Sequence, residues 1–430
     1  MNYWRSHYQD KLATAEQAAS LVKSGDFIVF SHACGEPRRL PGELVKRAPE
    51  LQDVNILHMV PMGDALYCRP ENATSFRHIS FFAGGSTRRA ISENRADFVP
   101  CFFNRIPSLL GAQFPVDVAM VSVSPPDENG YCSLGVSVDY TLKAVEVARL
   151  VICEVNPSMP RTHGKSFIHV QEIDCFVEVE EPIYELNRGE MSEVESSIGQ
   201  YITQLIDDGS CLQLGIGGIP DAVLSYLDNF KDLGIHSEMI SNGVMDLVEK
   251  GVVTCQRKNL HQGRIVVTFL MGTRAFYNWV DDNPFIEMHP VDYVNNPCVI
   301  AQNRNMISIN SALEVDLLGQ VCADTLGPNQ YSGVGGQVDF VRGAQMSESG
   351  KAIIALPSTA KGGAVSRIVP RLTAYSAVTT SRNDVDFVVT EQGIAVLKGK
   401  NTRQRIQALI SIAHPDFREE LDRQAAEIYS

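Results

Sequence analysis

Continuous runs of apolar residues recur along most of this chain, and a helical pattern follows nearly every one of them. Continuous rather than alternating hydrophobicity is typical of parallel strands that are buried on both faces. Such strands, alternating with helices, predict an α/β fold with mainly parallel sheets. The expected strands are Phe27–Phe30, Val54–His58, Val116–Val123, Leu150–Glu154, Cys211–Gly215, Ile265–Phe269, Met306–Asn310, Ala352–Ala355 and Phe387–Val389.

Helices are expected between these runs, and Thr14 is a plausible N-cap for the first of them. They are Thr14–Val22, Pro41–Arg47, Ser192–Ile206, Asp221–Leu227, Asn242–Lys250 and Thr402–Ile412. A chain of 430 residues exceeds a single hydrophobic core, so we expect two domains, with three possible. The acidic stretch Glu178–Glu193 contains Pro182 and Gly189 and has no regular period, which is typical of a linker. We therefore expect domains over residues 1–185 and 186–430.

Charge and cysteine usage exclude several classes of protein. The net charge is −14 and no basic stripe stands out, which argues against a nucleic-acid partner. No run of 18 apolar residues exists, and Met1–Arg5 lacks the apolar core of a signal peptide, so neither a membrane span nor secretion is expected. The ten cysteines are scattered without CxxC pairs, and several, such as Cys153 and Cys211, adjoin apolar runs. This pattern favours buried thiols in a reducing cytoplasm over zinc or disulfides.

A glycine-rich turn, Gly215–Pro220, follows the apolar run that begins at Leu212. This order predicts a strand entering a helix N-terminus, where backbone N–H groups can bind an anion. Pro220 suits the first turn of that helix. Pro220 also stands where the dinucleotide-binding fingerprint needs its last glycine, which argues against a dehydrogenase. A tight turn with no ligand fits the local sequence equally well.

The next strand after this turn is expected to carry a lone carboxylate, Glu238, between Ser237 and Met239. A carboxylate inside an apolar stretch costs free energy unless it is paired or functional. Beside an oxyanion-binding turn it has the parts needed for acyl transfer, provided that the two strands are neighbours. The alternative is a strand-end glutamate that points to solvent.

Four further segments are candidates for a ligand site. Tyr331–Phe340 mixes glycines with polar and aromatic residues and is typical of a loop that holds a ligand. Ser31–Pro37 and Val123–Cys132 follow expected strands, where open α/β sheets bind ligands, although plain surface turns fit equally well. Glu391 is a rival for the catalytic carboxylate, but a structural role at a turn, accepting backbone hydrogen bonds, is favoured.

Several segments together resemble the acetyl-CoA hydrolase/transferase family, and most closely its 4-hydroxybutyrate CoA-transferase branch, to which butyryl-CoA:acetate CoA-transferases are related. The resemblance implies two α/β domains of the NagB/RpiA/CoA-transferase-like type with the active site between them. It also implies ping-pong transfer, in which Glu238 becomes first an acyl anhydride and then a glutamyl-CoA thioester. The matching segments are Val123–Gly130, Leu212–Asp221, Leu233–Leu247, Gly333–Gly343, Thr379–Asp384, Thr390–Ala395 and Ala413–Phe417.

The same resemblance implies roles for further residues. Asn295 is similar to an asparagine that holds the substrate carboxylate. Gln392 departs from the tyrosine that close relatives often carry, which puts acyl preference in doubt more than the reaction. The implied contacts with CoA and the oxyanion are Gln213, Leu214, Gly215, Ile216, Gly217, Gly335 and Gly336.

The expected function is therefore transfer of CoA between a short-chain acyl-CoA and acetate, butyrate or 4-hydroxybutyrate. The resemblance implies a homodimer with CoA as substrate and no permanently bound cofactor. The alternatives are an acyl-CoA hydrolase on the same scaffold and, from another class, a non-catalytic CoA- or nucleotide-binding protein.

Overall fold

The computed structural model describes residues 3–429, so Met1 and Asn2 of the segment examined for a signal peptide lie outside it. The chain forms two compact units. The first contains the residues up to Asn187 together with Val266–Val294, and the second contains Arg188–Ile265 and the residues from Asn295 onward. Within residues 3–429, no helix combines the length and the apolar character that a membrane crossing requires.

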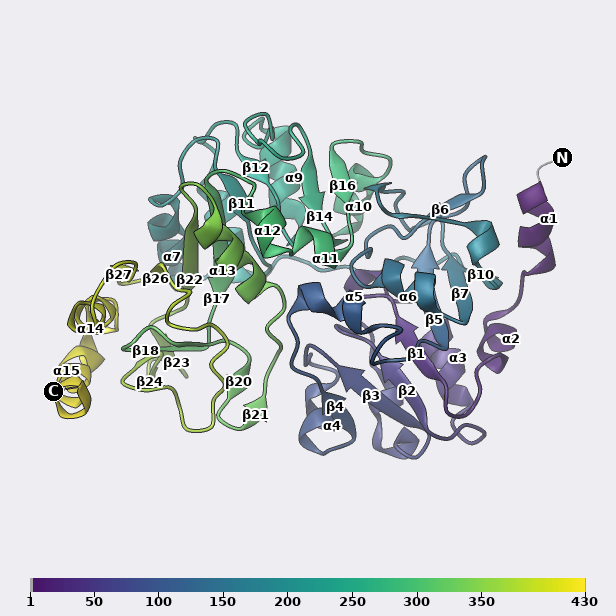
Figure 1. The fold of residues 1–430 in the computed structure, drawn as a ribbon, viewed down its shortest axis with the longest axis horizontal. Coiled ribbons are helices and arrows are strands. Elements are labelled where there is room, and N and C mark those ends of the chain that lie inside the picture. The colour runs from purple at the N-terminus through teal and green to yellow at the C-terminus, as the bar shows by residue number, and fades with distance from the viewer. Residues whose placement is uncertain (1–2, 430) are drawn as a thin grey trace. The chain divides into compact units, whose positions relative to one another are not determined.

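The first unit is built on a seven-stranded sheet in the order β10-β7-β5-β1-β2-β3-β4, with every neighbouring pair parallel. All residues of β5 and β1 are buried, as expected for central strands covered on both faces. Figure 1 shows these strands side by side in purple and blue. They are β1 (Phe27–Phe30), β2 (Val54–Leu57), β3 (Phe76–Ser80), β4 (Ala96–Phe98), β5 (Val118–Val123), β7 (Leu150–Val155) and β10 (Cys175–Glu178).

Helices of this unit pack on the sheet around a core that includes Phe30, Leu40 and Phe76. Thr14 caps α2 as predicted, since its hydroxyl accepts a hydrogen bond from the Gln17 backbone N–H at 3.2 Å. The α-helices are α1 (Tyr3–Asp10), α2 (Ala15–Ser20), α3 (Leu40–Lys46), α4 (Arg88–Ser92), α5 (Ile106–Leu109), α6 (Thr141–Val147), α10 (Arg274–Val280) and α11 (Val291–Val294). The 3-10 helices are η1 (Ala33–Gly35), η2 (Leu66–Cys68), η3 (Pro70–Asn72), η4 (Phe103–Arg105) and η5 (Val170–Glu172).

The second unit contains a six-stranded sheet in the order β12-β11-β17-β22-β26-β27, parallel except for the antiparallel edge strand β27. Helix α13 packs against β17 and β22, and α7 packs against β26 and α8 (Figure 1). The strands are β11 (Cys211–Gln213), β12 (Gly234–Ile235), β17 (Met306–Ser311), β22 (Lys351–Ala355), β26 (Phe387–Thr390) and β27 (Gly393–Val396). The helices are α7 (Glu193–Thr203), α8 (Gly218–Ser225), α9 (Asn242–Glu249), α12 (Pro297–Ile300), α13 (Gln337–Met346), α14 (Thr402–Ser411) and α15 (Pro415–Tyr429).

Short strands complete both units. Those of the first unit are β6 (Tyr131–Ser133), β8 (His163–Gly164), β9 (Phe167–His169), β15 (Phe269–Leu270) and β16 (Ile286–Met288). Strand β14 (Ile265–Val267) spans the point where the chain passes from the second unit, which ends there at Ile265, to the first. Those of the second are β13 (Met239–Ile240), β18 (Glu314–Asp316), β19 (Val321–Cys322), β20 (Thr325–Leu326), β21 (Asn329–Gln330), β23 (Thr359–Ala360), β24 (Val365–Ser366) and β25 (Ile368–Val369).

The prediction of an α/β chain with mainly parallel sheets is confirmed, and each expected strand and helix overlaps an observed one. The largest shift of an element's start is in α8, which begins at Gly218, three residues before the expected start at Asp221. Glu180–Ser192 contains neither helix nor strand, in agreement with a linker. The expected boundary after residue 185 differs from the observed units in one respect, since Val266–Val294 belongs with the first unit. The reason is strand pairing, because β16 lies parallel to β8, with Glu287 opposite His163.

Cysteine burial agrees with the sequence pattern. Eight of the ten cysteines are buried as thiols, including Cys153 and Cys211, which lie in β7 and β11. Burial raises the pKa of the Cys211 thiol to about 12, so this side chain behaves as a small hydrophobic group.

Candidate active site

The glycine turn lies where β11 ends and α8 begins, with Gly217 in the left-handed region at φ +110°. Strand β12 is the parallel neighbour of β11, with Leu212 opposite Ile235. The Ser237 hydroxyl joins the two strand ends, because it donates to the Leu214 carbonyl at 3.1 Å and accepts from the Leu214 N–H at 3.3 Å. The turn and the segment that carries Glu238 are therefore neighbours, as the sequence required.

Glu238 itself lies in a bend between β12 and β13, and the expectation that it sits within a strand is wrong. The strand ends at Ile235 because the chain turns to continue into β13 and α9. The bend leaves Glu238 partly exposed, whereas His236, Ser237 and Met239 around it are buried. Glu238 is therefore the partly exposed residue of an otherwise buried segment.

Two residues of the second unit define the surroundings of the Glu238 carboxylate. The side-chain amide of Asn295, which is fully buried, donates from Nδ2 to Glu238 Oε2 at 2.7 Å. Gly336 lies against the same oxygen, since a Cβ built on Gly336 would stand 2.0 Å from Glu238 Oε2 and 2.3 Å from Asn295 Nδ2. Only a residue without a side chain fits at position 336 while this hydrogen bond is kept.

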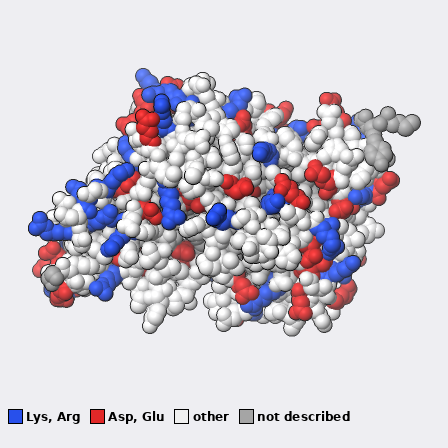
Figure 2. Space-filling view, viewed as in Figure 1, with Lys and Arg blue, Asp and Glu red and all other residues white. Residues whose placement is uncertain are grey.

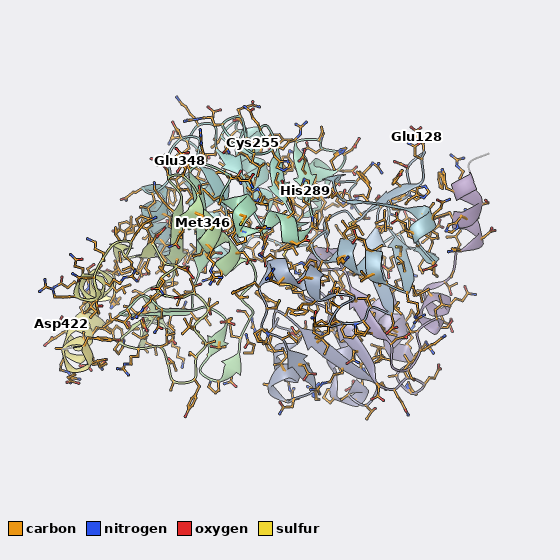
Figure 3. The ribbon with its side chains drawn as sticks, in the orientation of Figure 1. Glu128, Cys255, His289, Met346, Glu348 and Asp422 are labelled. Atoms are coloured by element: carbon orange, nitrogen blue, oxygen red, sulfur yellow. The ribbon has the colours of Figure 1, made fainter. Side chains whose placement is uncertain are left out.

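Gly336 is the N-cap of α13, and Gly335 before it has φ +54°. The Glu238 carboxylate therefore lies at the N-terminus of a ten-residue helix, whose dipole favours negative charge there. The expectation of a loop over Tyr331–Phe340 is wrong for its second half, because α13 begins at Gln337. The buried side chains of Val338, Phe340 and Val341 form the apolar face of this helix. Its C-terminal residue, Met346, is labelled in Figure 3.

The other predicted turn residues occupy different environments. Gln213 and Leu214 are buried, and Ile216 is exposed. The side-chain oxygen of Gln213 accepts hydrogen bonds from Ser308 and Asn310 of β17 at 3.0 and 3.1 Å. Neither Ser308 nor Asn310 is among the site residues expected from the sequence. Their signal is a pair of polar residues at positions i and i+2 within the otherwise apolar run Met306–Asn310.

Glu391 lies in the turn between β26 and β27. It accepts hydrogen bonds from the backbone N–H of Ser358, at 2.8 Å, and from the Ser358 hydroxyl. These bonds agree with the favoured interpretation of Glu391 as a carboxylate that accepts backbone hydrogen bonds at a turn.

Two predicted loops of the first unit are held by their own carboxylates. Asp127 accepts the backbone N–H groups of Asn129 and Tyr131 at 2.8 and 2.9 Å, which closes the turn that contains Glu128 (labelled in Figure 3). Glu36 accepts those of Met62 and Gly63 at 2.7 and 2.9 Å. Burial raises the pKa of Glu36 to about 7. Both loops follow β-strands of the first sheet, as expected.

A cavity of about 770 Å³ lies beside the Asp127 loop in the first unit. Its walls include Trp4 and Tyr8 of α1, Pro125 and Pro126. Over the face in Figure 2, acidic and basic side chains are interspersed, in agreement with a surface that carries no basic stripe.

Fold and site together define an α/β protein in which a carboxylate stands at the carboxyl end of a parallel sheet, beside a glycine turn and a helix N-terminus. The N-terminal domain of the acetyl-CoA hydrolase/transferase family matches residues 1–185, and its C-terminal domain matches residues 272–425. The chain belongs to the acetyl-CoA hydrolase/transferase family.

Individual relatives match over nearly the whole chain. A 4-hydroxybutyrate coenzyme A transferase of Clostridium kluyveri is 56% identical over 419 residues, which are 97% of this chain and 98% of the relative. A succinyl-CoA:cyclohexane-1-carboxylate CoA transferase of Geobacter metallireducens is 47% identical, over 97% of this chain and 95% of the relative. The solved structure of a 4-hydroxybutyrate CoA-transferase from Porphyromonas gingivalis superposes with a TM-score of 0.86 at 42% identity, over 99% of this chain and 100% of that one.

Proposed function

We propose that this chain is a CoA-transferase that moves CoA between a short-chain acyl-CoA and a carboxylate such as acetate, butyrate or 4-hydroxybutyrate, with Glu238 as the nucleophile. The observation that carries the proposal is the Glu238 carboxylate, bonded to Asn295 at 2.7 Å and placed at the N-terminus of α13. An amide donor and a helix N-terminus both stabilise negative charge. They favour the ionised carboxylate, which is the nucleophilic form.

In the proposed first half-reaction, a Glu238 oxygen attacks the thioester carbonyl. The carbon–sulfur bond breaks, and CoA thiolate leaves behind an acyl–glutamyl anhydride. The thiolate then attacks the glutamyl carbonyl and expels the acyl group as a free carboxylate, which leaves a glutamyl-CoA thioester. In the second half, an incoming carboxylate attacks that thioester, and the same two steps run in reverse to give the new acyl-CoA and free Glu238.

Each of these steps exchanges one energised acyl derivative for another, so positioning and exclusion of water are the main demands on the protein. The proposed donors to the developing oxyanion are the backbone N–H groups of the turn Leu214–Gly217 and of Gly335–Gly336. Both segments contain a glycine at positive φ, a conformation that exposes backbone N–H groups to an anion. In this scheme Asn295 holds Glu238 and, after the anhydride forms, is free to bind the substrate carboxylate.

The test is incubation of the purified protein with an acyl-CoA in the absence of any acceptor. Transfer predicts a burst of about one carboxylate per active site, followed by a halt, with no accumulation of free CoA. Glu238→Gln should abolish the burst. Steady release of free CoA would instead identify an acyl-CoA hydrolase, and release of neither product a non-catalytic CoA-binding protein.

We further propose that the chain acts in the cytoplasm as a homodimer. Eight buried thiols and the exposed, unbonded thiol of Cys298 support a reducing compartment. Sedimentation equilibrium tests the dimer, and a monomeric mass at micromolar concentration would contradict it.

A further inference from the structure

Three polar side chains meet at the carboxyl ends of β11 and β17. Gln213 is the last residue of β11, and Ser308 of β17 is its partner in the parallel ladder. Asn310 lies two residues further along β17 and therefore on the same face of the sheet. Gln213 and Ser308 are buried, so their polar atoms depend on one another for hydrogen bonds.

The oxygen of the Gln213 amide is fully engaged in this cluster. Oε1 accepts from Ser308 Oγ at 3.0 Å and from Asn310 Nδ2 at 3.1 Å, and an amide oxygen has two lone pairs. Asn310 Nδ2 also donates to Ser308 Oγ at 2.8 Å, which ties the two donors together. These bonds place Oε1, and not Nε2, against Ser308 Oγ and Asn310 Nδ2.

The nitrogen of the same amide is held much more loosely. Its contacts, to the Ile309 carbonyl and to Asn310 Oδ1, are both 3.4 Å long. N–H···O bonds in proteins centre near 2.9 Å, so neither contact is at its optimum. Gln213 thus presents two N–H groups whose present partners a better acceptor would replace.

Gln213 is also fixed with respect to the chain that carries Glu238. The residue after it, Leu214, is bonded through both its N–H and its carbonyl to the hydroxyl of Ser237. Ser237 directly precedes Glu238. The amide and the carboxylate therefore belong to adjacent strand ends on one edge of the second sheet.

We propose that Ser308 and Asn310 are positioning residues that hold the Gln213 amide with its N–H groups toward the reacting acyl group. This inference rests on the proposed function and deepens it. The oxygens that gain charge during acyl transfer can only accept hydrogen bonds, so a donor stabilises the transition state and an amide oxygen would repel it. Side chains that saturate Oε1 leave only the donor end of Gln213 for the substrate.

The substitution Asn310→Asp tests this orientation directly. It keeps the shape of residue 310 but replaces the Nδ2 donor with a carboxylate oxygen. The new carboxylate oxygen repels Oε1 and offers Nε2, which already contacts Oδ1 of residue 310 at 3.4 Å, a second acceptor, so the Gln213 amide should leave its present orientation. Loss of one oxyanion donor lowers kcat by about 100-fold or more. The KM for acyl-CoA should change by less than about threefold, because a transition-state contact affects kcat and kcat/KM alike.

Asn305→Asp is the matched control. Asn305 directly precedes the same strand and donates to the Ser210 hydroxyl at 2.9 Å. It undergoes the same chemical change within the same unit, and its variant should keep the parental kcat. An equal loss of kcat in both variants would overturn the inference, since it would reflect sheet stability alone.

A double-mutant cycle distinguishes positioning from an independent effect. In Gln213→Met the amide is absent, so adding Asn310→Asp should lower kcat by less than about threefold more. Full additivity of the two losses would overturn the inference. If Asn310→Asp fails to fold, Ser308→Ala, which removes one donor to Oε1, replaces it in the same cycle with a smaller single loss.

Measurements on the parent protein distinguish a failure of this inference from a failure of the proposed function. Absence of the carboxylate burst in the parent would refute the proposed function itself. A normal burst in the parent together with an unchanged kcat in Asn310→Asp would refute only the role of Ser308 and Asn310.

Discussion

The side-chain amide of Asn295 donates a hydrogen bond to the carboxylate of Glu238 across 2.7 Å, and Asn295 is fully buried. The two residues are 57 positions apart in the chain. In the proposed mechanism this contact orients the Glu238 carboxylate for nucleophilic attack. Asn295→Ala should lower kcat by about 100-fold, a typical effect of losing one donor to a reacting oxygen. Steady-state transfer kinetics on a folded variant measure it; an unchanged kcat would contradict the role.

Asn295→Asp should change the pH dependence as well as the rate. Two adjacent carboxylates cannot both ionise easily, so the pKa of one of them rises. The proposed mechanism requires ionised Glu238. The acidic limb of the pH profile of kcat/KM should therefore move upward by at least about one pH unit relative to the parent. An acidic limb at the parental pH would show that residue 295 does not face Glu238 in the working enzyme.

Gly336→Ala should inactivate the enzyme without unfolding it. The new methyl group would stand 2.0 Å from Glu238 Oε2, so the carboxylate must move. A displacement of about 1 Å at the reacting group costs on the order of 100-fold in rate. The backbone of Gly336, with φ −93° and ψ 5°, accepts alanine without strain. Gly42→Ala, in α3 with open space around the new methyl, is the control and should keep the parental rate.

Glu391 should matter for stability more than for chemistry. Its replacement by alanine leaves the buried Ser358 hydroxyl and the Ser358 N–H without their acceptor. An unsatisfied buried polar group costs about 1–3 kcal/mol, so the free energy of unfolding should fall by that order. The carboxylate burst at Glu238 should remain. Loss of the burst in a folded Glu391→Ala variant would make Glu391 part of the reaction.

Acid should destabilise the first unit through buried His78 in β3. Burial lowers the pKa of His78 to about 4, although its hydrogen bond with the Ile56 carbonyl opposes the shift. Since the unfolded histidine has a pKa near 6.5, the unfolded chain binds more protons below that pH, and stability falls as pH drops. From pH 8 to pH 5 the loss is about 2 kcal/mol for this residue.

His78→Gln removes that loss, so urea unfolding of parent and variant at both pH values isolates it. The raised pKa of Glu36 acts in the opposite direction between pH 4.5 and 7, because the folded protein holds that proton more tightly. It contributes equally to both proteins. Identical pH dependence in parent and variant would contradict the role of His78.

The regular elements were predictable because their signals are local. The run Phe27–Phe30 is the strand β1 residue for residue, and a Ser/Thr cap with periodic apolar residues marks α2. Gly215–Pro220 was read correctly as a strand–helix turn for the same reason, since glycine and proline act on their own backbone.

The pairing of the site residues was not local and needed either the structure or the family resemblance. Nothing in the residues around Asn295 shows that its amide reaches Glu238, and glycines before Gln337 suggested a loop where buried Val338 and Phe340 fold into α13. The return of Val266–Val294 to the first unit depends on strand pairing across more than 100 residues. Ser308 and Asn310 alternate with apolar residues in the sequence, which is a visible signal. Their hydrogen-bond partner, Gln213, lies on another strand and is not predictable from that signal.

The most direct measurement of the central claim is borohydride trapping of the parent protein after exposure to acyl-CoA without acceptor, followed by peptide mapping. Borohydride reduces a glutamyl thioester to the corresponding alcohol. The account predicts loss of activity that depends on acyl-CoA, with the reduced residue at Glu238 and unmodified Glu391. Activity that survives borohydride, or a reduced residue at any other position, would contradict it.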